Sequence, residues 1–181
     1  MRSLSRLGVL PLAATVVVGA TALQMTLVAF GNITDFGTNQ DFVRHVLAMD
    51  TTFQSPHMMW RAITSPGLAD AVYVAIIAWE LLTAVALVAG FIGRIVEHVS
   101  GRAVPRARLF SDLGLTMQLT LFGVGFIAIG GEWFQMWQSS KWNGLQPALQ
   151  NLIIASFGLV LSYLAAKDSQ RVASGPADGS S

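Results

Sequence analysis

The sequence ADAVYVAIIAWELLTAVALVAGFIG, residues 69–93, decides the fold of this chain. It is almost wholly apolar and long enough to cross a bilayer as a helix, for which about 20 residues suffice. Glu80 lies at its middle. An ionised carboxylate at the centre of a membrane helix costs roughly 2.5–3.5 kcal/mol on insertion scales, so we expect Glu80 to be paired, protonated or hydrated. We interpret the rest of the chain as the surroundings of this helix. The other charged residues of the chain are expected to avoid the depth in the membrane at which Glu80 lies.

The composition is that of a membrane protein. Of the 181 residues, 53% are hydrophobic and 12% are charged, whereas soluble domains contain about 25% charged residues. The net charge of +1 gives no indication of an acidic partner. The sequence also contains no basic run with interleaved aromatic residues of the kind that binds nucleic acid. The absence of cysteine excludes disulfides, thiolate nucleophiles and zinc–cysteine sites.

The same length rule predicts an all-α bundle of four transmembrane helices. The predicted spans cover residues 7–30, 69–93, 110–130 and 146–166, within a single domain of residues 1–168. The first could instead be a signal peptide, because Arg2 and Arg6 precede it and residues 20–22 resemble a cleavage site. We favour a span, because the apolar run continues well beyond Ala22. Residues 169–181 are expected to form a disordered tail.

Lysine and arginine predict the orientation, because cytoplasmic loops carry an excess of both. Arg44, Arg61 and Lys141 fall on one side of the predicted membrane. The other eight fall on the side of the termini: Arg2, Arg6, Arg94, Arg102, Arg106, Arg108, Lys167 and Arg171. Both termini are therefore expected to be cytoplasmic.

The first outer loop, residues 31–68, is predicted to be folded. Residues 38–41 (Thr-Asn-Gln-Asp) resemble a capping box, and apolar residues then recur at helical spacing as far as Met49. This pattern predicts a short amphipathic helix at the outer interface. Ser55-Pro56 and Ser65-Pro66 predict two further helix starts, of which the second opens the second span.

Tryptophan gathers in the two outer loops. Trp133 and Trp137 are four residues apart and are predicted to share one helix face. Such residues commonly form the aromatic belt at the headgroup level. The alternative is a surface for a partner, and the sequence leaves both open. The candidate surface comprises Trp60, Arg61, Glu132, Trp133, Trp137 and Trp142.

Glu80 has polar companions within the predicted membrane. Tyr73 and Thr83 share its helix face by the spacing of three and four, while Gln24 and Gln118 lie on the first and third spans. With three further threonines, Thr26, Thr116 and Thr120, these side chains could form a buried hydrogen-bonded ladder.

Such a ladder would serve either as a proton or cation relay or as a link between helices. Single interhelical hydrogen bonds average only about 0.6 kcal/mol in membrane proteins. We favour the structural role, because a relay needs a continuous string of titratable groups. Glu80 is the only such group that the sequence places at depth.

The histidines predict no metal centre. Asp41 and His45 are four apart on one helix face and could hold half a site, completed by His57, Asp50 or Glu132. Capping and solvation explain the same residues. The sequence contains no glycine-rich phosphate loop, nucleophile elbow or dinucleotide motif, and no histidine pair inside a predicted span for haem. No cofactor is indicated.

Five strings carry a resemblance to a known family: LVAFGNITD (27–35), MDTTF (49–53), WRAIT (60–64), IAWE (77–80) and GGEWF (130–134). They resemble a bacterial family of predicted small integral membrane proteins whose function is unknown. The likeness covers nearly the whole chain apart from the cytoplasmic loop and the tail. It implies a four-helix bacterial membrane protein and brings no assigned activity.

We therefore predict a non-catalytic accessory or scaffolding subunit of a complex in the bacterial inner membrane. Within the lipid bilayer, its tryptophan-rich outer loops and small-residue helix faces would bind another membrane protein or a second copy. The alternative is a small carrier or binding protein for protons, quinone, lipid or another amphipathic ligand, using Glu80 with Gln24 and Gln118. A weaker third hypothesis is a metal-dependent membrane enzyme built at the outer loops.

Overall fold

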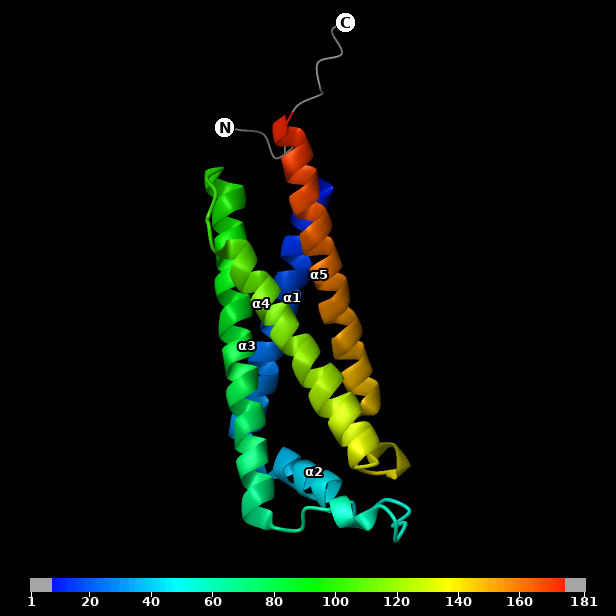
Figure 1. Cartoon of the computed structure of the whole chain (residues 1–181). Helices are drawn as coiled ribbons and strands as arrows, with labels where there is room; N and C mark the ends of the chain where they lie inside the picture. The colour runs from blue at the N-terminus through cyan, green and yellow to red at the C-terminus, as the bar shows by residue number, and fades with distance from the viewer. Residues whose placement is uncertain (1–7, 175–181) are drawn as a thin grey trace, which may run out of the picture.

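The computed structural model describes residues 8–174 and is helical throughout, without strands in that range (Figure 1). Its long helices are α1 (Val9–Thr34), α3 (Pro66–Ser100), α4 (Ala107–Thr120) and α5 (Leu145–Ser174), and a π-helix, η3 (Leu121–Trp133), continues α4. Four stretches of helix in this range are long and apolar enough to cross a membrane: Val9–Thr34, Pro66–Ser100, Ala107–Trp133 and Leu145–Asp168. The predicted all-α fold with four spans is confirmed.

The helices extend beyond the predicted spans. Helix α3 covers Pro66–Ser100 rather than 69–93, and α5 continues to Ser174. Residues 169–174, which the sequence analysis assigned to the tail, are therefore helical. The length rule counts only the hydrocarbon core, whereas a helix keeps its backbone hydrogen bonds in the interface as well. Leu7 and residues 175–181 lie outside the described residues.

The two ends of the bundle differ. The described chain begins and ends at one end, and the other end carries the connections between α1 and α3 and between η3 and α5 (Figure 1). We call residues 36–65 and 134–144 the cap. It contains α2 (Phe36–Ala48) and two 3₁₀ turns, η2 (Met59–Arg61) and η4 (Met136–Gln138).

Helices α3 and α4 lie against each other near the termini and diverge toward the cap, where α2 occupies the widening gap (Figure 1). Two glycines permit the close approach. A Cβ on Gly90 would lie 2.5 Å from the backbone nitrogen of Ser111, and a Cβ on Gly114 would lie 2.6 Å from Cγ of Leu87. Since real Cβ atoms do not come this close to neighbouring atoms, the crossing requires glycine at both positions.

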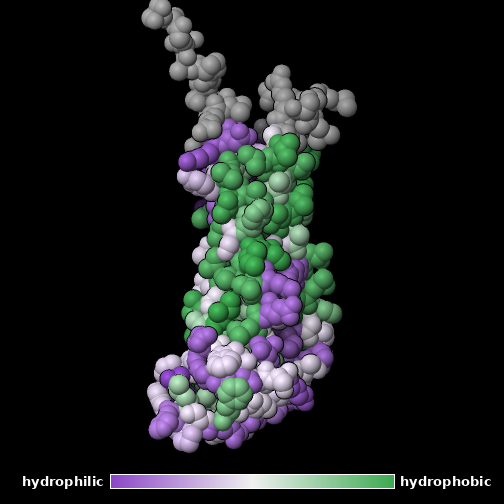
Figure 2. All heavy atoms as spheres, turned by 90° about the vertical axis from the view of Figure 1, so that its right-hand side faces the viewer, coloured by the Kyte–Doolittle hydropathy of each residue, from purple (hydrophilic) through white to green (hydrophobic). Residues whose placement is uncertain are grey.

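The buried apolar residues form two clusters. One lies between the four long helices and includes Val18, Met25, Leu87, Leu115 and Phe122. The other lies under the cap and includes Val46, Leu47, Tyr73, Phe134 and Met136. Figure 2 shows hydrophobic residues over most of the visible bundle and a mainly hydrophilic surface at the cap end. The cap is therefore a folded layer with its own core.

The predicted cap helix exists, but it starts earlier than expected. Helix α2 begins at Phe36, directly after Asp35, and no side chain caps its first turn. The predicted capping box at residues 38–41 therefore lies inside the helix. The prediction that Ser65-Pro66 opens the second span is confirmed, since α3 begins at Pro66.

The predicted pairing of Trp133 and Trp137 on one helix face is wrong. The π-helix ends at Trp133, Gln135 adopts a positive φ of 56°, and residues 136–138 form a separate 3₁₀ turn. The break at Gln135 separates the two tryptophans, so their spacing of four no longer places them on one face.

Candidate functional site

Glu80 lies in the middle of α3 and is only 2% exposed. The side-chain amide of Asn32, near the end of α1, donates a hydrogen bond to Oε2 of Glu80 at 2.6 Å. Two further bonds converge on Asn32: the hydroxyl of Tyr73 donates to its backbone oxygen at 3.2 Å, and Nδ2 of Asn39 donates to its Oδ1 at 2.6 Å. Asn32 thus connects the Glu80 carboxyl with the first turns of α2.

Gln24 and Gln118 meet at a different residue. Each donates its amide to Oδ1 of Asn151 on α5, both at 3.1 Å, and Nδ2 of Asn151 donates to the backbone oxygen of Pro147 at 2.9 Å. Among the described residues, Oε1 of Gln118 is buried without a hydrogen-bond partner.

The expected polar ladder is therefore divided into two separate groups. The four threonines join neither group, because each hydroxyl donates to the backbone oxygen four residues earlier in its own helix, as threonine commonly does. These bonds run from Thr26 to Ala22, Thr83 to Trp79, Thr116 to Asp112 and Thr120 to Thr116.

Asn32 and Asn151 were missed by the sequence analysis. Asn32 fell just outside the first predicted span, which ended at residue 30. Asn151 lies inside the fourth span and carried the same signal as Gln24 and Gln118, a polar side chain within an apolar run. Searching every span for amides would have found it.

Arg94 is a second charged residue whose side chain is buried in the bundle. It was assigned to the cytoplasmic loop, yet it is 8% exposed within α3. Its guanidinium donates to Oγ of Ser111 at 2.8 Å and to Oγ of Ser162 at 2.7 Å, and it lies 3.9 Å from the carboxylate of Asp112. These hydrogen bonds join three helices and compensate its burial.

The candidate outer surface is only partly brought together. The guanidinium of Arg61 lies over the rings of Trp60, at 5.5 Å, and Trp133, at 4.6 Å, and these two rings meet edge to face at 5.6 Å. Trp137 instead packs edge to face on Phe53 at 5.9 Å. The structure therefore assembles two separate aromatic pairs in place of one stripe.

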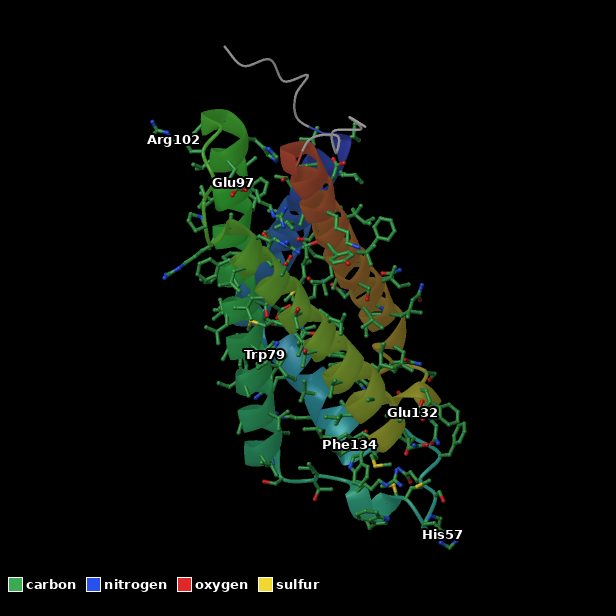
Figure 3. All side chains as sticks on the ribbon, turned by 45° about the horizontal axis from the view of Figure 1, so that its top comes forward. His57, Trp79, Glu97, Arg102, Glu132 and Phe134 are labelled. Carbon is green, nitrogen blue, oxygen red and sulfur yellow. The ribbon has the colours of Figure 1, made fainter. Side chains whose placement is uncertain are left out.

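The remaining two members of that surface take no part in these aromatic pairs. Trp142 packs into the cap, where it stacks on His45 at 4.7 Å with Lys141 over its ring. Glu132 is exposed at the end of η3 (Figure 3).

Several bonds hold the cap together. Thr51 donates to Ser139 and the backbone nitrogen of Phe53 donates to Gln138, both at 2.8 Å, which ties the two outer loops together. Arg44 on α2 donates two hydrogen bonds of 2.8 Å to the carboxylate of Asp70 on α3. These hydrogen bonds raise the pKa of the Arg44 guanidinium above its ordinary value.

Residues 10–165 match the family described as predicted small integral membrane protein (DUF2165). This chain belongs to that family. The resemblance noted in the sequence is thereby confirmed, and the protein is a predicted integral membrane protein of unknown function. No curated protein and no solved structure matches the chain.

The weak metal candidates of this DUF2165 member do not converge. Nδ1 of His45 lies 2.7 Å from Oδ2 of Asp50, and His57 lies at the far edge of the cap (Figure 3). Within residues 8–174, no three His, Cys, Asp or Glu side chains form a group that could hold a metal ion.

Proposed function

We propose that this DUF2165 protein is a non-catalytic accessory or scaffolding subunit of a membrane complex, and that its cap binds the partner. One observation carries the proposal: four large aromatic side chains are exposed, three in the cap and one at the adjoining end of η3, namely Phe53 at 73%, Trp60 at 69%, Trp137 at 46% and Trp133 at 45%. Aromatic residues are enriched in protein interfaces, and tryptophan and arginine are frequent among the residues that dominate binding energy.

The geometry of these side chains favours a partner protein over an aromatic belt. A belt consists of rings that anchor at the headgroup level. Here the rings form two edge-to-face pairs, and Arg61 is held between Trp60 and Trp133. Within the described residues, Nε of Arg61 is buried without an acceptor.

The bracing of the cap supports the same role. Interfaces gain affinity when their contact residues are already ordered, because less conformational entropy is lost on binding. The exposed rings project from loops that are joined by the Thr51–Ser139 and Phe53–Gln138 hydrogen bonds.

We further propose that the membrane is the bacterial inner membrane, with both termini in the cytoplasm and the cap outside. The excess of lysine and arginine at the terminal end supports this orientation. The proton-linked alternative has less support, because Glu80 bonds to Asn32 while Gln24 and Gln118 bond to Asn151.

The experiment is extraction of the tagged chain in a mild detergent from cells that naturally contain it, followed by native mass measurement. We expect a particle that contains a stoichiometric second membrane protein or a second copy. The double variant Trp60→Ala, Trp137→Ala should lose this partner. Phe157→Ala is the matched control, because Phe157 is 61% exposed but lies on α5.

Two results would contradict the proposal. One is a monomer without a partner in several mild detergents. The other is a complex that survives the double substitution in the cap as well as it survives the Phe157 substitution.

A further inference from the structure

A cavity of about 180 Å³ lies between α2, α3 and η3. It occupies the region where α3 and η3 diverge, above α2 (Figure 1). Every lining residue is apolar or glycine: Phe42, Val43, Val46, Leu47, Val72, Ile76, Leu121, Gly125, Phe126, Ile129, Gly130, Phe134 and Met136.

The cavity is bounded at two ends by neighbouring helices. Toward the cap it is closed by α2 and by Phe134, which is 5% exposed at the end of η3 (Figure 3). On the opposite side α3 and α4 come together, and Nε1 of Trp79 donates to the backbone oxygen of Met117 at 3.0 Å. Ile129, which lines the cavity, is 47% exposed, so the cavity opens to the side of the bundle at η3.

The π-helix η3 forms one wall of the cavity. Such helices are rare and frequently occur at functional sites. Gly125 lies on η3 at the cavity wall, and a Cβ built on it would have only Cδ1 of Leu121 within 4 Å, at 3.7 Å. A larger side chain at this position would enter the cavity.

We propose that this cavity is a binding site for one hydrocarbon chain of a membrane lipid. Its α3 and η3 walls belong to helices that are long and apolar enough to span the bilayer, so its side opening faces lipid. A cavity of about 150 Å³ lined by apolar side chains binds benzene in another protein, which shows that this volume holds several carbon atoms.

The lining chemistry selects a chain over a polar ring. A quinone ring carries carbonyl groups, and burying these among side chains that offer no hydrogen-bond donor costs free energy. A hydrocarbon chain loses no hydrogen bond on entry. A hydrocarbon chain in the bilayer is already surrounded by apolar groups, so moving it into the cavity gains no hydrophobic free energy. The gain comes from van der Waals contacts that the lining side chains lack when the cavity is empty. The lipid headgroup remains outside the opening.

The test is photolabelling of the full-length protein in nanodiscs of phosphatidylcholine that contain a trace of the same lipid with a diazirine on one acyl chain. Peptide mapping should place more label on the residues of α2, α3 and η3 that line the cavity than on the lipid-facing sides of α1 and α5. Gly125→Leu should reduce this label by about fivefold or more, the effect of losing roughly 1 kcal/mol of contact energy. Gly31→Leu is the control, because a Cβ on Gly31 has no atom within 4 Å.

Each other outcome overturns the proposal. Label that is spread evenly over the lipid-facing sides of α1 and α5, or that persists in Gly125→Leu, would show that the cavity holds no chain. If Gly125→Leu does not fold, Val72→Phe fills the cavity from α3 and must give the same loss. A long-chain quinone that displaces the label better than a lipid of equal chain length would refute the preference for a chain. None of these results depends on whether the cap binds a protein.

Discussion

Nδ2 of Asn32 lies 2.6 Å from Oε2 of Glu80. This bond fastens the end of α1 to the middle of α3, and both partners are buried. Asn32 also accepts hydrogen bonds from Tyr73 and Asn39, so one amide residue joins α1, α2 and α3. The buried carboxyl of Glu80 is therefore part of the contact that positions the cap on the bundle.

The Asn32–Glu80 bond predicts unequal effects of two substitutions. Asn32→Ala removes the donor and leaves the carboxyl buried without it, whereas Glu80→Gln keeps an oxygen that Asn32 can bond. We expect Asn32→Ala to lower the free energy of unfolding by about 1–3 kcal/mol and Glu80→Gln by less than about 1 kcal/mol. Unfolding in mixed micelles measures both.

A double-mutant cycle with Asn32→Ala and Glu80→Ala isolates the pair. Its coupling energy should fall near the values for membrane hydrogen bonds, with a mean of about 0.6 and a maximum of about 1.7 kcal/mol. A clearly larger coupling energy, or a Glu80→Gln variant as unstable as Asn32→Ala, would indicate that Asn32 bonds to an ionised carboxylate rather than to a neutral carboxyl group.

Asn151 predicts a second stability effect. Its Oδ1 accepts from both Gln24 and Gln118, so Asn151→Ala removes the side-chain acceptor of two amides and leaves Gln118 only the long bond of 3.5 Å to the backbone oxygen of residue 151. We expect a loss of about 1–3 kcal/mol in the free energy of unfolding. Ser156→Ala is the control on the same helix, because the Ser156 hydroxyl bonds only to the backbone of its own helix, at Leu152. Equal losses in both variants would show that Asn151 does not link the helices.

The α3–α4 crossing predicts the effect of one added methyl group. In Gly90→Ala the Cβ would lie 2.5 Å from the nitrogen and Oγ of Ser111, so the helices must separate, at an expected cost of about 1–3 kcal/mol. Gly67→Ala, in the first turn of α3, has no atom within 4 Å of the new Cβ. It should be neutral or slightly stabilising, because alanine favours a helix. Thermal unfolding in detergent compares the two, and similar midpoints would argue against the crossing.

The sequence was sufficient to predict the fold, because the length of its apolar segments alone predicts four transmembrane helices. It also indicated the cap helix, since hydrophobic spacing predicts a helix independently of what it packs on. Helical spacing placed Glu80, Tyr73 and Thr83 on one face, but spacing cannot say which residue of another helix lies opposite. That register depends on contacts such as Gly90 with Ser111, which join residues distant in sequence. The expected ladder failed for this reason.

Two other differences between the sequence-based predictions and the structure have local causes. Arg94 was assigned to a loop because its span was counted only to residue 93, whereas Ser111 and Ser162 allow the guanidinium to be buried. Trp133 and Trp137 were separated by the end of the π-helix and the left-handed residue Gln135. A pattern with a period of 3.6 residues does not reveal either feature.

The Arg44–Asp70 pair predicts how firmly α2 is held. Asp70→Asn removes the charge that accepts two hydrogen bonds from Arg44 and one from Gln40, and all three join α2 to the start of α3. We expect faster hydrogen exchange across residues 36–48, with little change in the long helices. Because both side chains are partly exposed, raising the salt concentration should speed the exchange of α2 in the unmodified protein and have less effect in the variant. Arg108→Gln, which removes an exposed ion pair with Asp112 at the other end of the bundle, is the control. Unchanged exchange of α2 in Asp70→Asn would show that its apolar face alone holds the helix in place.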